Sequence, residues 1–424
     1  MSNTHGKLLI GRRIAVIGAG PIGLEAALYG VALGAEVRIY ESGRVAQHVG
    51  EWGHVRLFTA FEMNHTPLGR RTLEAEGRTL PENDAVQSGA EWRDSYLLPL
   101  AEHTAVADAL VLGSRIITVG KRGMLKGDHV GNEQRAGEPF RLLVETEDGE
   151  RYEEAEVVLD CSGSWGNPNW LGQGGVPALG EREARDRIVY HPADVTGSHR
   201  GRFAHRRTLL IGDGLSAATT AVALAELASE ARDTQAVWVT AAAASTPIRP
   251  IADDSLDRRA ELIRAANDIA LVADSDLEWL PGSTVTAVRW DGDRFQVTLD
   301  TPEGERIGEF QEVIANVGYE PDNSLYGELQ VHECYASRGP MKLAATLLAA
   351  TADAGDDCLK LGGFGPDVLV NPEPDFFILG MKSYGRNSAF LLQTGFDQIR
   401  DVYCLLTSEP ELNLYAPQGA QTEQ

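Results

Sequence analysis

Cysteine is scarce in this chain, and the few cysteines are scattered. Only four occur among 424 residues, with no Cys-x-x-Cys pair and no Cys/His spacing typical of zinc: Cys161, Cys334, Cys358 and Cys404. Disulfide-stabilised secreted domains and zinc sites both need cysteines at close, repeated spacings. We therefore expect a reduced, cytoplasmic compartment and no bound metal.

Clusters of basic residues and long apolar runs are also missing. Lys and Arg number 38 against 62 Asp and Glu, a formal net charge of −24. Nucleic-acid-binding proteins usually present a basic face, and an anionic membrane repels an acidic surface. No apolar run reaches the ~20 residues of a membrane span, and the N-terminus lacks the apolar core of a signal peptide. We expect no nucleic-acid or membrane partner, and interpret the acidity as a source of solubility.

Glycine, by contrast, is abundant. The chain has 45 glycines and is 43% apolar, which is typical of a soluble α/β protein with many tight turns. At roughly 100–200 residues per domain, its length predicts two or three domains.

A glycine-rich turn follows the first apolar run, at 14–17. Gly18, Gly20 and Gly23 stand there as G-x-G-x-x-G. In a dinucleotide-binding turn the first glycine permits the sharp bend, the second lets a pyrophosphate approach the backbone, and the third lets helix and strand pack closely. The start of the following helix offers free N–H groups to the phosphates.

The sequence after this turn completes the pattern. A helical stretch ends near Gly34, and the strand E-V-R-I-Y is closed by Glu41, at about the distance where an acid reaches the ribose hydroxyls. The order strand, turn, helix, strand and acid predicts a dinucleotide site formed by Gly18, Gly20, Pro21, Ile22, Gly23 and Glu41.

Residues 207–223 repeat the pattern. A strand at 208–211 leads into Gly212, Gly214 and Ala217, the G-x-G-x-x-A variant, and then into a helix. Two such turns favour two cofactors, a flavin and a pyridine nucleotide that reduces it. The alternative is a duplicated scaffold without a second cofactor.

The second turn lacks an acid at the end of its second strand. Thr240 stands there, followed by A-A-A-A-S-T-P-I-R-P. An acid would repel the 2′-phosphate of NADPH, so its absence favours NADPH, with NADH as the alternative. Ser245 and Arg249 are the nearest phosphate ligands, with Arg258 and Arg259 behind them, although each Arg could instead be solvated or ion-paired. The predicted second site is Gly212, Gly214, Ser216, Ala217, Thr240 and Arg249.

Two further strands end in small-residue turns. E-V-V-L-D-C leads into Ser162 and Gly163, and Q-E-V-I-A-N-V leads into Gly318. We interpret both turns as places where the backbone passes close to a cofactor.

These motifs resemble those of the flavoproteins with paired FAD and NAD(P)H domains, which include thioredoxin-reductase-like enzymes and flavin-containing or N-hydroxylating monooxygenases. I-G-A-G-P-I-G with Glu41 looks like their FAD site, and I-G-D-G-L-S-A like their NAD(P)H site. I-A-N-V-G-Y-E-P resembles the segment that returns to the FAD domain. D-F-F-I-L-G-M-K-S-Y-G-R-N resembles the last FAD segment, with Gly380 and Met381 beside the cofactor. The resemblance covers nearly the whole chain.

Two departures bear on the reaction. The disulfide reductases of this group use a close pair of cysteines, which is missing here, so we do not expect dithiol chemistry. Their last FAD segment usually reads Gly-Asp, whereas this chain has Gly380-Met381. The F-x-G-x-x-x-H fingerprint of the Baeyer–Villiger monooxygenases is not found in that form either, and the subfamily stays open.

The segment after Glu41 mixes aromatic, imidazole and guanidinium groups. In the related fold it passes the flavin ring, and a wall of aromatics with few polar groups suits a ligand site. The alternative is a packed loop whose aromatic side chains fill gaps. The candidates for lining flavin or substrate in this segment are Trp52, His54, Arg56, Phe58, Phe61, Asn64 and His65.

Two other stretches offer candidates of the same kind. The loop 162–172 holds Trp165, Asn167 and Trp170, which either border the same cavity or pack a turn. Near the end, Lys382, Tyr384, Arg386 and Asn387 precede a helix whose start would face the flavin. No residue of the chain is predicted to be a covalent catalyst.

The expected architecture is α/β, with two doubly wound Rossmann-type domains. A discontinuous FAD-binding domain comprises 1–195 and 316–424, the NAD(P)H-binding domain comprises 196–315, and residues 65–110 are mainly helical.

The resemblance implies a monooxygenase that is reduced by NADPH and hydroxylates a small soluble substrate with O2 through a flavin hydroperoxide. The alternatives are a flavin dehydrogenase or reductase without oxygen insertion, and a non-catalytic nucleotide-sensing protein. A homo-oligomer is among the states that the sequence allows.

Overall fold

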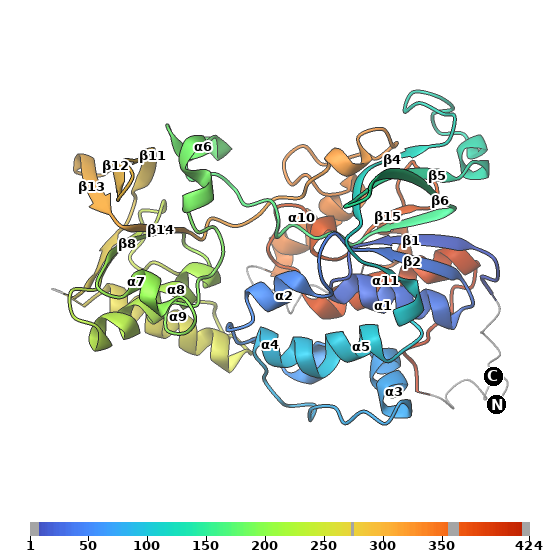
Figure 1. Cartoon of the computed structure of the whole chain (residues 1–424), viewed down its shortest axis with the longest axis horizontal. Coiled ribbons are helices and arrows are strands. Elements are labelled where there is room, and N and C mark those ends of the chain that lie inside the picture. The colour runs from blue at the N-terminus through green and yellow to red at the C-terminus, as the bar shows by residue number, and fades with distance from the viewer. Residues whose placement is uncertain (1–7, 273–274, 355–363, 418–424) are drawn as a thin grey trace. The chain divides into compact units, whose positions relative to one another are not determined.

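The computed structural model describes residues 8–272, 275–354 and 364–417 (Figure 1). The chain divides into two compact units. Unit 1 comprises 1–53, 59–166 and 320–424, and unit 2 comprises 54–58 and 167–319.

Unit 1 is built on a parallel five-stranded sheet in the order β15-β7-β1-β2-β3. Its central strand pairs on both sides, Ile14 with Val37 of β2 and with Val157 of β7. Four buried positions in a row make this strand apolar on both faces, as a central parallel strand requires. The strands are β1 (Arg13–Ile17), β2 (Glu36–Tyr40), β3 (Leu110–Val111), β7 (Val157–Asp160) and β15 (Phe376–Ile378).

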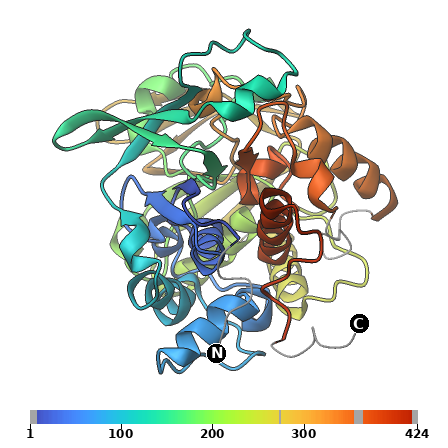
Figure 2. The same ribbon diagram turned by 90° about the vertical axis from the view of Figure 1, so that its right-hand side faces the viewer.

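Each face of this sheet carries a covering layer. An antiparallel sheet of β4 (Arg115–Lys121), β5 (Phe140–Thr146) and β6 (Gly149–Ala155) packs on one face through a shared apolar core. The helices α1 (Pro21–Ala32) and α11 (Leu392–Thr407) lie side by side on the other (Figures 1 and 2).

Short helices of the 61–109 region form an outer layer against α1. They are η1 (Phe61–Met63), α3 (Pro67–Ala75), α4 (Gly89–Trp92), the π-helix η2 (Arg93–Leu97), α5 (Leu98–Glu102) and η3 (Ala107–Ala109). The remaining helices of unit 1 are α2 (Gln47–Glu51), η4 (Glu133–Gly137), η7 (Ser324–Tyr326), α10 (Met341–Ala354), η9 (Pro366–Leu369) and η10 (Gly380–Tyr384).

Unit 2 repeats the same plan with a parallel four-stranded sheet, β10-β9-β8-β14, and an antiparallel sheet, β11-β12-β13. Apolar cores cover both faces of the parallel sheet. Its strands are β8 (Arg207–Ile211), β9 (Gln235–Val239), β10 (Leu277–Leu280), β11 (Thr284–Trp290), β12 (Phe295–Thr301), β13 (Gly304–Phe310) and β14 (Glu312–Ala315). Its helices are η5 (Gln173–Gly175), α6 (Glu181–Ala184), η6 (Arg185–Arg187), α7 (Arg200–Phe203), α8 (Leu215–Glu230) and α9 (Asp257–Ala270).

The α/β architecture with two parallel sheets matches the sequence-based expectation. The longer segment of unit 2 begins at Asn167. The reason is packing, because Leu171, Ala178, Ile188 and Tyr190 are buried in the core between the two sheets of unit 2. This segment ends at Tyr319.

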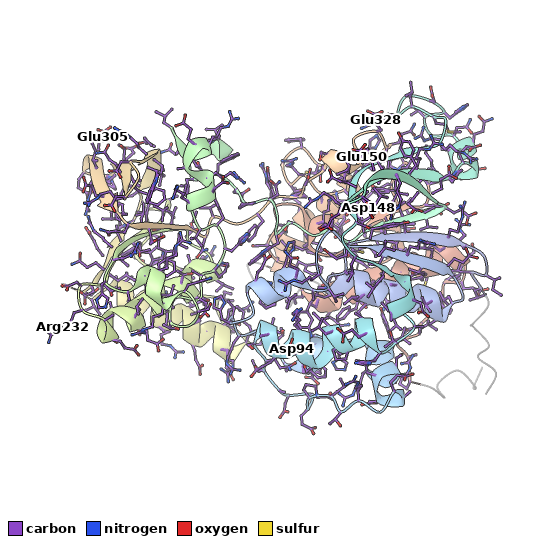
Figure 3. All side chains as sticks on the ribbon, viewed as in Figure 1. Asp94, Asp148, Glu150, Arg232, Glu305 and Glu328 are labelled. Carbon is purple, nitrogen blue, oxygen red and sulfur yellow. The ribbon has the colours of Figure 1, made fainter. Side chains whose placement is uncertain are left out.

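The acidic side chains of the hairpins point to solvent. Asp148 and Glu150 lie at the β5–β6 turn, and Glu305 is the second residue of β13 (Figure 3). In the described ranges, no helix is long and apolar enough to cross a bilayer.

Candidate functional site: two glycine turns and a buried ion pair

The first glycine turn has the geometry that its three glycines predict. Gly18 has φ +99°, and a Cβ there would lie 2.9 Å from the carbonyl oxygen of Cys161. A Cβ on Gly23 would lie 1.9 Å from the carbonyl oxygen of Gly18. A Cβ on Gly20, in contrast, would meet nothing within 4 Å. Gly18 and Gly23 are therefore required by packing, whereas Gly20 leaves open space at the start of α1.

Glu41 lies at the end of β2 and holds this turn. Its carboxylate accepts hydrogen bonds from the backbone N–H of Ala19 at 2.8 Å and of Gly43 at 2.7 Å. Pro21 occupies the first turn of α1, where its missing N–H costs nothing. An acid half-exposed beside a glycine turn can also accept hydroxyl hydrogen bonds, as a ribose would require.

The second turn has the same construction. Gly212 has φ +132°, and a Cβ there would lie 2.2 Å from the carbonyl oxygen of Asn316, whereas a Cβ on Gly214 would meet nothing within 4 Å. Ala217 is fully buried in α8, and Ser216 is half-buried beside it. The side chain of Asn316 accepts from the hydroxyl of Thr220 at 2.8 Å, but its buried Nδ2 has no hydrogen-bond partner within the described part of the chain.

The residues proposed for a 2′-phosphate fall into two groups. Thr240 is buried and accepts from the indole N–H of Trp279 at 3.0 Å. Ser245, Arg249 and Arg258 are exposed. Arg259 is committed to a buried bidentate ion pair with Asp254, at 2.6 and 2.9 Å, so it is poorly placed to bind a further anion.

The structure distributes the aromatic segment between the two units. Trp52 belongs to unit 1, where its ring lies 6.5 Å from that of Trp92. His54, Arg56 and Phe58 belong to unit 2. Burial lowers the pKa of His54, an effect that the Asp194 carboxylate partly opposes.

Asn64 and His65 make bonds within their own segment. The side-chain oxygen of Asn64 accepts a hydrogen bond from the Thr59 hydroxyl, and its amide group donates to the carbonyls of Thr59 and Ala60. His65 stacks on Phe61 with 4.4 Å between the ring centroids. These contacts shape the loop, and the role of the segment in ligand binding stays a prediction.

The loop after β7 contributes side chains to both units. The indole N–H of Trp165 donates to Glu51 at 2.7 Å in unit 1. In unit 2, the Arg185 guanidinium lies 4.1 Å from the ring centroid of Trp170. Asn167 begins the longer segment of unit 2. Gly163 and Gly318 have φ +70° and +79°, as tight turns require.

The segment around Gly380, which resembles the last FAD segment, is held by contacts with neighbouring elements. Gly380 has φ +71°, and its N–H donates to the side chain of Gln398 on α11 at 2.8 Å. Met381 is half-buried, and Tyr384 is buried edge-on to Phe390. The remaining candidates lie further along: Arg386 pairs with Glu320 at 2.6 Å, and the side chain of Asn387 accepts from the N–H of Ala389 at 2.9 Å.

Lys382 takes part in a buried ion pair that sequence reasoning missed. Its Nζ lies 2.6 Å from a carboxylate oxygen of Asp160 and donates to the hydroxyl of Ser162 at 3.0 Å. The Ser162 hydroxyl donates to the other oxygen of Asp160 at 2.6 Å. The Lys382 and Asp160 side chains are 1% and 0% exposed. The only feature of the sequence that could have indicated this ion pair is Asp160, an acid at the end of the otherwise apolar strand β7.

This ion pair lies at the carboxyl edge of the unit 1 sheet, where ligands bind in open α/β folds. Ser162 contacts the first glycine turn, since its Cα would be 3.3 Å from a Cβ on Gly18. The pair therefore ties the end of β7 to the last segment directly beside the open face at Gly20. Among the described residues, no cluster of His, Cys, Asp or Glu suits a metal.

Comparison with known proteins identifies solved structures that share the fold of this chain. No protein-family model and no curated protein sequence matches the chain. Solved structures do, among them bacillithiol disulfide reductase from Bacillus cereus, with 16% identity, TM-score 0.64 and coverage of 94% of this chain and 99% of that one.

Two monooxygenases are equally similar. Ornithine N-hydroxylase from Kutzneria sp. 744, with reduced FAD, NADP+ and L-ornithine, has 16% identity and TM-score 0.62, covering 93% of this chain and 98% of that one. The FAD-bound cadaverine monooxygenase from Erwinia amylovora has 14% identity and TM-score 0.65, covering 97% and 99%. The chain therefore has the two-dinucleotide-binding-domain fold of the thioredoxin-reductase-like flavoproteins.

Proposed function

We propose that the protein is an oxidoreductase that binds FAD in unit 1 and is reduced by NAD(P)H bound in unit 2. The observation that carries this proposal is the open space at Gly20 and at Gly214. Gly18 and Gly23 in the first turn, and Gly212 in the second, leave no room for a Cβ, whereas a Cβ on the middle glycine of each turn would meet nothing within 4 Å. A pyrophosphate that approaches the backbone explains such a glycine.

The residues around the first turn suit FAD. Gly18, Gly20 and Gly23 shape the cradle, the first N–H groups of α1 would donate to the phosphates, and Glu41 would accept from the ribose hydroxyls. Ser162, Gly163, Gly380 and Met381 lie on the turns that border the same sheet edge. When bound, FAD accepts a hydride from NAD(P)H and passes electrons to an acceptor.

The residues around the second turn suit NAD(P)H. Gly212, Gly214, Ser216 and Ala217 form the phosphate turn, and the unpartnered Nδ2 of Asn316 offers a hydrogen-bond donor beside it. Thr240 follows β9 at the position where an acid would repel a 2′-phosphate. Arg249 is exposed on the loop that follows and is our candidate for a 2′-phosphate, so we propose NADPH, with NADH as the alternative.

We propose a monooxygenase acting on a small soluble substrate with O2, rather than a dithiol reductase. The solved structures of similar fold include both kinds. A dithiol reductase needs two neighbouring sulfurs, whereas the closest pair in this sequence is Cys334 and Cys358. Burial raises the pKa of the Cys161 thiol, which opposes thiolate chemistry next to the first turn. A dehydrogenase without oxygen insertion and a nucleotide-sensing protein are the alternatives.

Matched glycine variants test the two cofactor sites. Because a Cβ fits at Gly20 and at Gly214 without a protein clash, Gly20→Ala and Gly214→Ala should fold. Gly20→Ala should purify without flavin absorbance. Gly214→Ala should stay yellow but lose anaerobic bleaching by NADPH. Gly137→Ala and Gly201→Ala, at exposed positions where a Cβ also meets nothing within 4 Å, are the controls.

The same protein then tests the reaction with oxygen. NADPH is added without oxygen, air is admitted, and the spectrum and the released hydrogen peroxide are followed during a screen of small amines and sulfides. Incorporation of labelled oxygen into a product would support the monooxygenase, and reoxidation that never yields such a product would favour the dehydrogenase. A purified wild-type protein that takes up no FAD would overturn the proposal.

A further inference from the structure

Asn316 lies at the point of the unit 2 sheet where the strand order reverses. Successive crossovers lead from β8 outward through β9 to β10, and the chain then returns to the other side of β8 as β14, with all neighbours parallel. In open α/β sheets ligands bind at such a reversal, in the crevice at the carboxyl ends of the two strands. Gly212 is the first residue after β8, and Asn316 is the first residue after β14.

The backbone holds Asn316 against the second glycine turn. Its N–H donates to the carbonyl oxygen of Ile211 at 2.8 Å, and its own carbonyl oxygen would lie 2.2 Å from a Cβ on Gly212. Asn316 is 6% exposed, and its Oδ1 accepts from the hydroxyl of Thr220 on α8 at 2.8 Å. The amide group therefore lies between the glycine turn and the first two turns of α8, the helix whose start would bind phosphates.

The amide nitrogen is the unsatisfied part of this side chain. Nδ2 of Asn316 is buried and has no hydrogen-bond partner among the described residues, so its N–H groups lack an acceptor there. A buried donor without a partner destabilises a folded protein, and such groups are rare in native structures. A polar side chain at this position therefore lowers the stability of the nucleotide-free protein.

Unit 1 shows that the fold does not require an amide here. Cys161 occupies the equivalent position as the first residue after β7. Its N–H donates to the carbonyl oxygen of Ile17 at 3.0 Å, and its own carbonyl oxygen would lie 2.9 Å from a Cβ on Gly18. The buried thiol of Cys161 packs there as a small apolar group. Because the backbone arrangement is the same with either residue, packing does not explain the amide of Asn316, whereas a ligand of unit 2 does.

We propose that the Asn316 amide donates a hydrogen bond to a pyrophosphate oxygen of the nicotinamide dinucleotide bound in unit 2. This inference rests on the proposed function, because it assigns a residue to the second cofactor site. Phosphate oxygens only accept hydrogen bonds, so they match an amide nitrogen with protons to donate. The open position at Gly214 lets the pyrophosphate approach the same turn. The donor is held in place in the free protein at a cost in stability, and the ligand supplies its acceptor.

Asn316→Leu, an apolar replacement of similar size, separates ligand binding from folding. The variant loses the unpartnered nitrogen, and Thr220 keeps an acceptor because its hydroxyl also lies 3.0 Å from the carbonyl oxygen of Ser216. The melting temperature of the nucleotide-free protein should therefore stay the same or rise. The affinity for NADP+, measured by calorimetry on the full-length protein, should nevertheless fall at least about tenfold, as expected for a lost hydrogen bond to a charged acceptor. Unchanged affinity would overturn the proposal, and so would a fall of both quantities, which is the mark of a structural role.

Thr208→Val is the matched control. Thr208 is fully buried, and its hydroxyl also has no hydrogen-bond partner in the described ranges, but it lies near the amino end of β8, away from the glycine turn. This variant should likewise keep or raise the melting temperature, while its affinity for NADP+ stays at the wild-type value. An equal loss of affinity in Thr208→Val and Asn316→Leu would refute the assignment.

Two further comparisons locate the hydrogen bond. 2′-Phospho-ADP-ribose, which keeps the pyrophosphate but lacks the nicotinamide, should lose affinity in Asn316→Leu by the same factor as NADP+. A loss with NADP+ alone would overturn the pyrophosphate assignment. Asn316→Asp should bind NADP+ more weakly than Asn316→Leu at about pH 8, because a carboxylate repels the phosphates. Wild-type affinity in Asn316→Asp would overturn the assignment of the amide as a donor.

The wild type separates this inference from the function on which it rests. A wild-type protein that binds neither NADP+ nor NAD+ would contradict the proposed function itself. Wild-type binding together with unchanged affinity in Asn316→Leu would contradict only the role of Asn316.

Discussion

The buried carboxyl of Glu25 makes the stability of unit 1 depend on pH in a predictable way. Glu25 lies on α1 and is 1% exposed. It accepts a hydrogen bond from the hydroxyl of Tyr96 on the π-helix and another, at 2.8 Å, from the hydroxyl of Thr66, which caps α3. Burial, partly offset by these hydrogen bonds, raises its pKa from 4.5 to about 7.

The sign of the effect follows from proton binding. Between the two pKa values the folded protein holds a proton that the unfolded chain has released, so this group's contribution to stability is present below pH 4.5 and is lost as the pH rises through about 7. With about 1.4 kcal/mol for each pKa unit, the contribution lost amounts to about 3 kcal/mol. Most of that, about 2.5 kcal/mol, is lost between about pH 5 and pH 8.5.

Glu25→Gln isolates this contribution, because an amide of the same shape does not titrate. The difference in free energy of unfolding, variant minus wild type, should rise by about 2.5 kcal/mol from about pH 5 to pH 8.5. A constant offset of about 1 kcal/mol for one weakened hydrogen bond does not alter that rise.

Urea denaturation followed by circular dichroism, at intervals across this range, measures the difference. Glu76→Gln, which removes a carboxyl at an exposed position, is the matched control. If the Glu25→Gln difference did not change with pH, the carboxyl would not be carrying a proton at neutral pH, and the reasoning would be refuted. A carboxylic acid band near neutral pH in the infrared spectrum of the wild type, absent from the variant, gives a second readout.

Other substitutions test the packing of the first site. Lys382→Met leaves the buried carboxylate of Asp160 unpaired, so urea denaturation should show a loss of about 3–5 kcal/mol; removing both charges with Asp160→Asn in addition should restore part of it. Gly23→Ala should destabilise the protein severely, because its Cβ would overlap the carbonyl oxygen of Gly18, whereas Gly20→Ala should leave the melting temperature of the flavin-free protein within a few degrees of the wild type. Equal melting temperatures for the two alanine variants would contradict the distinct roles of the two glycines.

The ion pair at Lys382 also marks a difference between the first site of this chain and the FAD site of the flavoproteins that its motifs resemble. The reductases that the motifs resemble usually have Gly-Asp in the last FAD segment, whereas this chain has Gly380 and Met381, and the next residue is a lysine held by Asp160. A neutral, fully buried pair rigidifies the turn without placing a net charge at the sheet edge. Cofactor affinity in Lys382→Met, compared with Lys382→Arg, would separate the charge from the packing.

Much of the architecture could be predicted from the sequence, because the features that encode it are local. An apolar run of four or five residues, a glycine that must take positive φ, and a glycine where helix meets strand are adjacent in the chain. Their steric requirements hold wherever the turn lies in space. The strands at 13–17, 36–40 and 207–211, and the open position at Gly20, all follow from such local rules.

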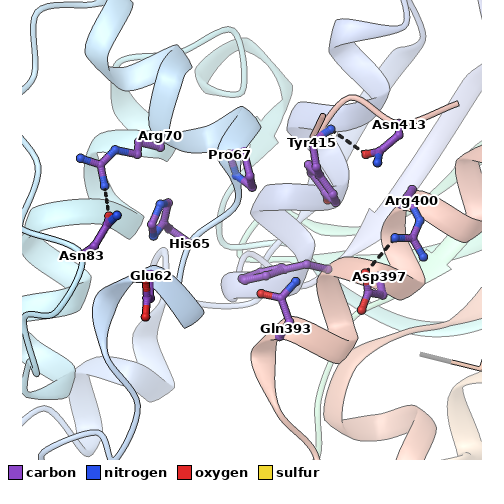
Figure 4. Close-up of a pocket in the computed structure, with 11 residues that line it drawn as sticks. Glu62, His65, Pro67, Arg70, Asn83, Gln393, Asp397, Arg400, Asn413 and Tyr415 are labelled. Carbon is purple, nitrogen blue, oxygen red and sulfur yellow. Dashed lines mark hydrogen bonds and ion pairs between the residues drawn. The ribbon is translucent and has the colours of Figure 1, made fainter. Parts of the chain in front are cut away.

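Only the tertiary structure decided which distant side chains meet. In the sequence, Lys382 is an isolated base and Asp160 an acid at the end of a strand, and only the fold pairs them. Glu25 and Tyr96 are hydrogen-bonded across a separation of 71 residues. A cavity lined by residues of α3 and α11 likewise joins segments from opposite ends of unit 1 (Figure 4). The start of the longer segment of unit 2 at Asn167 was also decided by which core residues 167–195 enter. Periodicity and glycine spacing specify backbone conformation within a segment, whereas ion pairing, burial and cavity shape depend on how close separate segments approach, and that distance is set by packing of the whole unit.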